Sequence, residues 1–199
     1  MNGPVLSGWI DYDRPHLSAL SPSQRIDYFE RRVRLVAINP LGRILNTEIT
    51  PSPDSSALLI FGVSLCCAVE AAGKFVSGGR GANGERFLAF LHKYMAAEYQ
   101  TSTVGGVTFG EALWVHFRNG LAHGFAVCHG GFERNRGQPY FETNIVAGHE
   151  SLSLNPSAFF DDFDQGLARY VSELRAAQPT GGLFVDFNSV FDVVFVQGR

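Results

Sequence analysis

The sequence predicts a mainly α-helical fold (α+β), an antiparallel bundle of about five helices with a small antiparallel β-sheet or hairpin extension. Two patterns lead to this prediction. From residue 21 to 124, and again from 157 to 177, apolar side chains recur every three or four residues, as in amphipathic helices. From residue 125 to 154 the pattern changes to short runs of β-branched and aromatic residues separated by glycines, which is typical of strands. The 199 residues are expected to form a single domain, 1–199.

The composition is that of a folded globular protein, with 45% hydrophobic and 18% charged residues. A net charge of -3 excludes a protein that coats nucleic acid through bulk positive charge. The N-terminal residues lack the pattern of a signal peptide, and the longest apolar run, 57–69, is too short to cross a bilayer. We therefore expect no contact with a membrane, and nothing in the sequence predicts a cofactor.

Cysteine usage points to a reducing compartment. Cys66 and Cys67 are adjacent inside an apolar run and are interpreted as small core residues. With Cys128 they make an odd count without Cys-x-x-Cys spacing, which predicts neither a disulfide framework nor a zinc site. The expected location is the cytoplasm.

The N-terminal part begins with an arm and one helix. Residues 1–20 hold glycine, proline and aspartate among scattered aromatics, and are expected to form an extended arm. The helical core, residues 21–124, starts where Ser21 caps a helix and Pro22 occupies its first turn. Pro40 is expected to end or kink this first helix.

Glycine and proline clusters delimit the next three helices. The second helix, from about residue 55 to 76, is apolar almost all round and should be the central, buried one. Residues 78–81, Gly-Gly-Arg-Gly, end it and are interpreted as a turn, because a phosphate loop would follow a strand. A third helix is predicted from about 83 to 99. After a loop at 101–107, a fourth runs from near residue 108 to 124.

The remaining residues predict strands, a closing helix and a hairpin. Strands are expected at 125–128, 140–146 and 151–154 within a β insertion that spans 125–154. Asn-Pro at its end opens a closing helix, 155–178, with a buried aromatic face. The tail, 183–197, is rich in phenylalanine and valine and is predicted to be a C-terminal hairpin that pairs with other strands or with a second subunit.

The candidate catalytic residues gather at the end of the fourth helix. Arg118, Asn119 and His123 lie together on its polar side, and Gly124 is expected to provide a left-handed cap. In the last turn the helix dipole favours the imidazolium form of His123, which suits a group that transfers protons. Arg118 keeps its charge and has forked donors that match a phosphate, while Asn119 could orient the imidazole or donate to a phosphate oxygen. This set predicts metal-free cleavage of a phosphodiester.

A carboxylate in the second helix is expected to support this site. Glu70 interrupts the most apolar helix of the chain, and a buried carboxylate is costly unless it is paired. It either faces Arg118 or His123, or pairs with Lys74 along its own helix. A purely structural role also stays open, in which Arg118 and His123 only form salt bridges to Glu70 or Glu111 and cap the helix.

Two other kinds of site were weighed. His116 shares a helix face with His123 and is kept as a supporting residue, although an exposed surface position is the favoured interpretation. A metal site from these two histidines and Glu111 is disfavoured because Glu111 lies off that face, so no metal is predicted. A hydrolase that uses Cys128 with His129 or His123 is also disfavoured, since neighbouring residues on a strand point to opposite faces.

The motif at the end of the fourth helix resembles that of the HEPN superfamily. These α-helical domains carry Arg-x4–6-His, often Arg-Asn-x-x-x-His, at the end of a core helix, and residues 118–123 read Arg-Asn-Gly-Leu-Ala-His. The resemblance covers residues 55–125, with the helix from 157 closing the bundle. The preceding helix of such proteins often bears an acidic residue, as Glu70 does here. The β-rich parts are not included in the basic helical fold of the superfamily.

The resemblance implies a metal-independent endoribonuclease of a toxin–antitoxin, defence or RNA-processing system. In such proteins the two motifs of a homodimer face each other across one groove, so a second copy, RNA and an antitoxin-like protein are the implied partners. His123 would activate the ribose 2′-OH or protonate the leaving 5′-oxygen, and Arg118 would stabilise the phosphorane, leaving a 2′,3′-cyclic phosphate. The alternative is a non-catalytic module that binds RNA, a nucleotide or a protein, or serves dimerisation.

Overall fold

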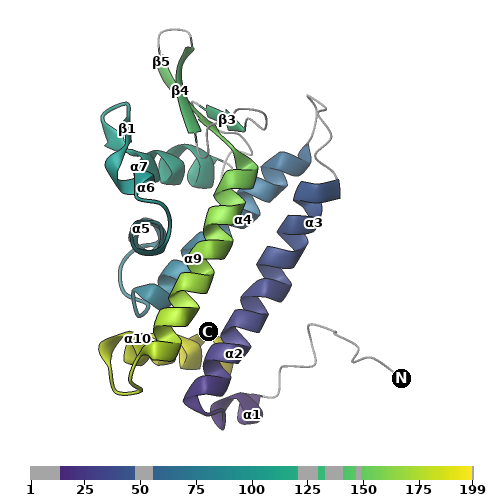
Figure 1. The fold of residues 1–199 in the computed structure, drawn as a ribbon, viewed down its shortest axis with the longest axis vertical. Helices are drawn as coiled ribbons and strands as arrows, with labels where there is room; N and C mark the ends of the chain where they lie inside the picture. The colour runs from purple at the N-terminus through teal and green to yellow at the C-terminus, as the bar shows by residue number, and fades with distance from the viewer. Residues whose placement is uncertain (1–13, 48–55, 121–129, 133–140, 147–148, 199) are drawn as a thin grey trace.

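The computed structural model describes residues 14–47, 56–120, 130–132, 141–146 and 149–198 (Figure 1). Within these residues the chain is mainly α-helical with a small strand content, as the sequence predicts. The helical elements, with η for wider π-helical turns, are α1 (Arg14–Ser18), α2 (Pro22–Val33), η1 (Arg34–Ile38), α3 (Asn39–Thr47), α4 (Ser56–Val76), α5 (Asn83–Tyr94), α6 (Glu98–Thr101), α7 (Phe109–Ala112), η2 (Leu113–Asn119), α9 (Pro156–Ala176), α10 (Gly182–Phe191) and η3 (Asp192–Val196). The strands are β1 (Thr103–Val104), β2 (Val107–Thr108), β3 (Gly130–Phe132), β4 (Phe141–Val146) and β5 (His149–Leu154).

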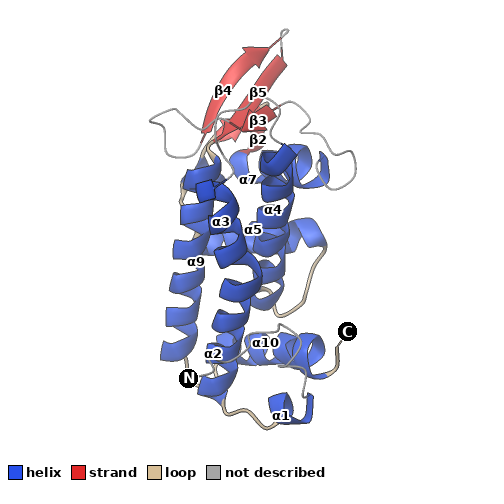
Figure 2. Cartoon of the chain, turned by 90° about the vertical axis from the view of Figure 1, so that its right-hand side faces the viewer, coloured by secondary structure: helices blue, strands red, loops and turns tan. Residues whose placement is uncertain are grey.

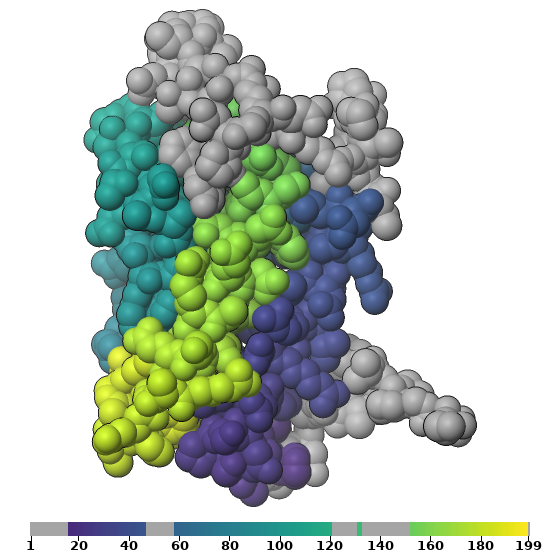
Figure 3. All heavy atoms as spheres, in the orientation of Figure 1, coloured from purple at the N-terminus to yellow at the C-terminus, as the bar shows by residue number. Residues whose placement is uncertain are grey.

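Long helices run roughly side by side through the middle of the molecule. α4 packs against α3, α5, α9, α10 and η2, and so connects most of the bundle. The three-stranded sheet lies at one end of the bundle, while α1 and α10 lie at the other (Figure 2). The space-filling view shows α9 packed between α2–α3 and the helices that follow α4 (Figure 3). The ends of η2 and α4 that carry the candidate site therefore belong to the helical body.

The first helix starts as predicted but does not stop at its proline. Ser21 and Gln24 form a reciprocal capping box, and Pro22 opens α2. The chain then stays helical through η1 and α3 to residue 47. Asn39 donates its N–H to the Arg34 carbonyl, five residues earlier, so the wider turn comes directly before Pro40. A π-helical turn is one of the ways in which a helix accommodates a proline, which has no N–H to donate.

Aromatic rings hold the lower half of the bundle together. The Phe29 ring of α2 lies 4.6 Å from that of Phe75 in α4 and 5.5 Å from that of Phe187 in α10. It also meets Tyr170 of α9 edge-on at 5.9 Å. All four side chains are buried. Aromatic pairs at such centroid distances add about 0.5–1.5 kcal/mol each beyond the burial of their area.

The prediction of a C-terminal hairpin at 183–197 is wrong, because residues 182–196 form helix α10 followed by η3. Phe184, Phe187 and Phe191 are spaced by three and four residues, so that one helix face buries all three. Asn188 and Ser189, near the middle of the predicted hairpin, lie inside α10. An apolar run that lacks strict alternation does not distinguish a buried helix from a strand, and here packing on α2 and α4 favours the helix.

The β insertion is a mixed sheet and not the expected antiparallel one. β4 and β5 pair antiparallel, but β3 lies parallel to β5 at its other edge. β3 contains Gly130 and Gly131, which the sequence analysis had taken as a separator. The predicted strand at 125–128 lies outside the described residues.

Three smaller boundaries also differ from the prediction. The third helix stops at Tyr94, where Met95 is extended, and the short α6 follows. The expected loop at 101–107 contains a hairpin of β1 and β2, whose turn places Gly105 and Gly106 at positive φ. Part of the expected N-terminal arm is the short helix α1, because its Leu17 is buried in the body of the protein.

The central helix is buried on one side only. Cys66 is 1% exposed, but Cys67 is exposed and Ile60 keeps 61% of its surface in solvent. α4 is central, as predicted, but only one side of it is buried. The prediction that the cysteines are core residues is confirmed for Cys66 and wrong for Cys67. Contrary to the expectation drawn from residues 57–69, the stretch Leu58–Val76 is long and apolar enough to cross a membrane, and 44% of that window is buried inside the fold.

Candidate functional site

The helix that carries the site begins at a cap formed by Thr108. The Thr108 hydroxyl accepts from the Glu111 N–H at 3.3 Å, and the Glu111 carboxylate accepts from the Thr108 N–H at 2.7 Å. The same carboxylate also accepts the Thr108 hydroxyl at 2.8 Å, so Glu111 serves the cap. Leu113 and Phe117 are buried in the core and fix the rotation of η2 about its axis. The predicted end of this helix, with His123, lies outside the described residues.

Arg118 pairs with Glu70 across the gap between η2 and α4. Arg118 Nε donates to Glu70 Oε2 at 2.9 Å, and Nη2 lies 2.7 Å from the same oxygen. The two side chains are only 15% and 17% exposed, so water screens this contact weakly. The prediction that Glu70 faces Arg118 is confirmed, and the carboxylate reaches across to η2 instead of turning along α4 toward Lys74.

Two more side chains hold the same guanidinium. Asn119 Oδ1 accepts from Arg118 Nη1 at 3.2 Å. The Trp114 ring lies under the guanidinium, with its centroid 4.7 Å from the Arg118 Cζ, a cation–π distance. The structure therefore brings Arg118, Asn119 and Glu70 together and adds Trp114, one helical turn before Arg118.

Within the described residues, the Arg118 guanidinium keeps donors without an acceptor. An arginine head has five N–H groups in a fixed plane, and Glu70 and Asn119 engage at most three of those of Arg118. The other two, one on Nη1 and one on Nη2, have no acceptor among the described residues. Planar N–H groups of this kind suit the oxygens of a phosphate.

The local backbone is a π-helical turn of seven residues, Leu113–Asn119. Such turns are rare and occur frequently at functional sites. His116 is half-buried in the same turn, and Phe117 packs edge-on against Phe132 of β3 at 5.3 Å. The β insertion thus rests on the element that presents Arg118.

Two neighbours of Arg118 were not among the predicted site residues. Trp114 lies four residues before Arg118, which is the spacing of side chains that stack on a helix. Cys67 was assigned to the core, but its thiol is exposed one turn before Glu70. Burial raises the pKa of Cys67, and Glu70 raises it further, while the charge of Arg118 opposes both, which places this thiol in the same electrostatic neighbourhood.

Metal ligands do not cluster in the part of the chain that the structure describes: it contains no group of three or more His, Cys, Asp or Glu side chains that could hold an ion. Three of the residues considered for a metal or a thiol site, His123, Cys128 and His129, are not among those described. Glu111, the third candidate ligand, is engaged in its cap.

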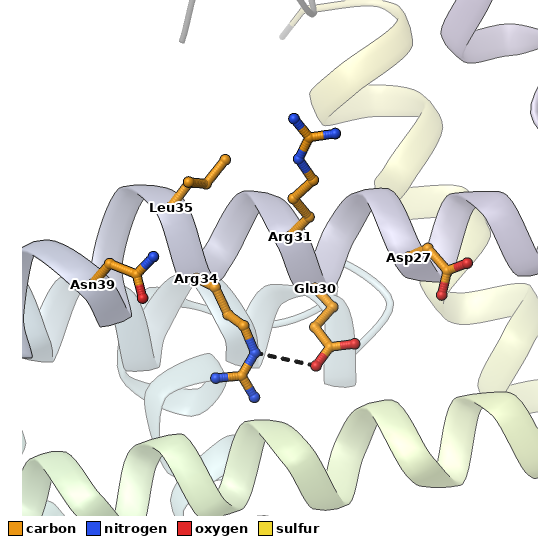
Figure 4. Close-up of a pocket in the computed structure, with 6 residues that line it drawn as sticks. All are labelled: Asp27, Glu30, Arg31, Arg34, Leu35 and Asn39. Atoms are coloured by element: carbon orange, nitrogen blue, oxygen red, sulfur yellow. Dashed lines mark hydrogen bonds and ion pairs between the residues drawn. The ribbon is translucent and has the colours of Figure 1, made fainter. Parts of the chain in front are cut away.

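A shallow pocket on the outside of α2 and η1 is made of paired charges (Figure 4). Arg34 bonds Glu30 at 3.2 Å and Asp164 at 2.8 Å, and Arg175 of α9 contacts both Asp27 and Glu30. Figure 4 shows Arg31 pointing away from the Glu30–Arg34 pair. These contacts are those of a surface ion-pair network that joins α2 to α9. The pocket is lined by Asp27, Glu30, Arg31, Arg34, Leu35 and Asn39.

No family model, curated protein or solved structure matches this chain. The resemblance to HEPN domains therefore remains a hypothesis carried by residues 118–123 and Glu70.

Proposed function

We propose that this protein is a HEPN-like, metal-independent endoribonuclease of a toxin–antitoxin, defence or RNA-processing system in the cytoplasm. The observation that supports it most is that neighbouring side chains hold the guanidinium of Arg118 in place. Glu70 and Asn119 hold it, and one N–H group on each of Nη1 and Nη2, without an acceptor among the described residues, is proposed to bind a phosphate. A guanidinium fixed in advance stabilises charge that develops on a phosphorane without having to reorganise during the reaction.

In the proposed reaction the ribose 2′-oxygen attacks the adjacent phosphorus while the bond from phosphorus to the 5′-oxygen breaks. One histidine, His123, takes the proton of the 2′-OH as general base. The imidazolium of a second His123 gives a proton to the leaving 5′-oxygen. The products are a 2′,3′-cyclic phosphate and a 5′-OH, and the requirement for a 2′-OH restricts the substrate to RNA.

A homodimer would supply the second histidine, and α4 offers a face for it. The exposed positions Ile60, Ser64, Cys67 and Ala71 recur at spacings of four, three and four residues. This is the spacing of a two-helix seam, and its small side chains allow close approach of an identical helix about a two-fold axis. Cys67 lies one turn before Glu70, so the seam borders the Arg118 site and would bring two sites toward one groove.

The experiment is cleavage of mixed tRNA and of a structured model RNA in EDTA, by wild type and His123→Ala in parallel. Wild type is expected to cut and to leave 2′,3′-cyclic phosphate ends, while His123→Ala stays folded and dimeric but does not cut. Equal cleavage by both proteins, or products with 3′-OH ends, would contradict the proposed chemistry.

A second candidate is a non-catalytic module that binds RNA, a nucleotide or a protein partner of the antitoxin type. One observation favours it. The charge of Glu70 neutralises that of Arg118, as is expected for a buried ion pair that only stabilises the fold. The net charge of -3 points the same way. Retention of the model RNA by wild-type dimers without any cleavage would select this function over the nuclease.

A further inference from the structure

Trp114 packs against one face of the Arg118 guanidinium, whereas its polar partners contact only the edges. Both Arg118 contacts to Glu70 converge on a single oxygen, Oε2, and two donors on one acceptor leave the head free to tilt about that oxygen. The bond to Asn119 restrains this tilt from the residue next in sequence. The indole under the guanidinium, with 4.7 Å between ring centroid and Cζ, blocks the tilt toward α5.

The indole is itself fixed from behind by α5. Its ring packs against the Phe87 ring at 5.5 Å, and Phe87 is fully buried. The backbone of Gly84 lies so close that a Cβ there would be 2.9 Å from the Trp114 Nε1. Only a residue without a side chain permits this approach. The position of the indole is thus set by the start of α5, an element outside the Arg-x4-His motif.

We infer that Trp114 is a positioning residue, which together with Gly84 sets the direction of the Nη1 and Nη2 N–H groups of Arg118. The catalytic consequence rests on the proposed function, whereas the orientation of Arg118 is a property of the folded protein alone. A residue that positions a transition-state contact is expected to change kcat more than KM, because a misdirected guanidinium still attracts the phosphate but meets the phosphorane poorly.

The first test compares Trp114→Phe with Trp114→Leu by NMR of the arginine Nε–H groups. Phenylalanine keeps a ring face under the guanidinium, and leucine does not. In wild type and Trp114→Phe we expect a slowly exchanging Arg118 Nε–H, and in Trp114→Leu exchange about ten-fold faster or more. Arg25, which lies 5.1 Å from the Phe191 ring, serves as the internal control and should not change. Unchanged Arg118 exchange in Trp114→Leu would overturn the inference.

The second test uses Gly84→Ala. This substitution changes neither Trp114 nor Arg118, but it adds a methyl group that would displace the indole. In the RNA cleavage assay we expect kcat to fall by up to about 10²-fold at nearly constant KM, with Trp114→Phe closer to wild type than Trp114→Leu. A rise in KM at unchanged kcat, or equal kcat in all variants, would overturn the inference. If wild type does not cleave, the proposed function fails, while the Nε–H exchange still decides whether Trp114 orients Arg118.

Discussion

A single acidic residue on an apolar helix carries most of the information about the site. Glu70 is the only charged residue in α4 apart from Lys74, and a carboxylate there requires a partner. That reasoning predicts the contact with Arg118 from the sequence. It could not choose Arg118 over His123 or Lys74, because the choice depends on how η2 is rotated against α4. The indole of Trp114 was missed for the same reason, since the spacing of four identifies a neighbour but not its role.

Glu70→Gln is expected to lower the free energy of unfolding by about 1–3 kcal/mol, because the isosteric change leaves the buried Arg118 without its counter-charge. Asp164→Asn is the matched control. It removes one partner of Arg34, but that pair is 36% and 38% exposed, and such pairs contribute about 0–1 kcal/mol. Urea unfolding of both variants measures the difference. Equal losses would show that the Glu70–Arg118 pair behaves as an ordinary surface salt bridge.

At the scale of the elements, periodicity predicted most helices and failed in the C-terminal tail, whose apolar residues fit a helix or a strand. The closing helix α9 buries Phe163, Leu167, Tyr170 and Leu174, as its three- and four-residue spacing predicts. In α10 the same aromatic richness was taken for a strand, because only contacts with α2 and α4 identify its helical face. The π-helical turns were not predictable, since they depend on how each helix packs.

The link between α5 and α9 should make stability depend on pH. Glu173 accepts the Tyr94 hydroxyl at 2.7 Å, and this bond, with Lys93, holds the pKa of the Glu173 carboxyl below its usual 4.5. A carboxyl with a lowered pKa in the folded state stabilises the protein above pH 4.5, and this contribution is lost as the pH falls through the folded value.

Tyr94→Phe is therefore expected to lower the unfolding free energy at neutral pH, with the loss disappearing once the pH has fallen through the folded pKa of Glu173. Tyr170→Phe is the control, because the Tyr170 hydroxyl is buried and makes no hydrogen bond within the described residues. Urea unfolding across the pH range would test both. A loss in Tyr94→Phe that is the same at every pH would show that the bond to Glu173 does not lower the carboxyl pKa.

At the scale of the whole molecule, the one-sided burial of α4 is the feature that could not be predicted from the sequence. Apolar residues all round a helix predict full burial in a monomer, but they are also what a helix needs when a second chain covers its open face. The sequence alone does not separate these cases. The exposed seam at Ile60, Ser64, Cys67 and Ala71 became visible only once the neighbours of α4 were placed.

If the proposed dimer forms through α4, Ile60→Glu is expected to yield a monomer, because a charge at the seam would be desolvated against its own copy. Val185→Glu on α10 is the control, since Val185 is similarly open, at 51% against 61% for Ile60. Light scattering after size-exclusion chromatography measures the mass, which for a dimer is twice the 21.8 kDa of one chain. A wild type of 21.8 kDa, or dimers of both variants, would contradict dimerisation through α4.

The most direct measurement is the single-turnover rate of RNA cleavage by Arg118→Lys in EDTA. Lysine keeps the charge but not the planar fork, so we expect the rate constant to fall by about 10²–10³-fold. Arg34→Lys, in an ion pair remote from the site, should cleave at the wild-type rate. A rate for Arg118→Lys equal to that of Arg34→Lys would show that Arg118 only holds α4 and η2 together, and that it takes no part in phosphodiester cleavage.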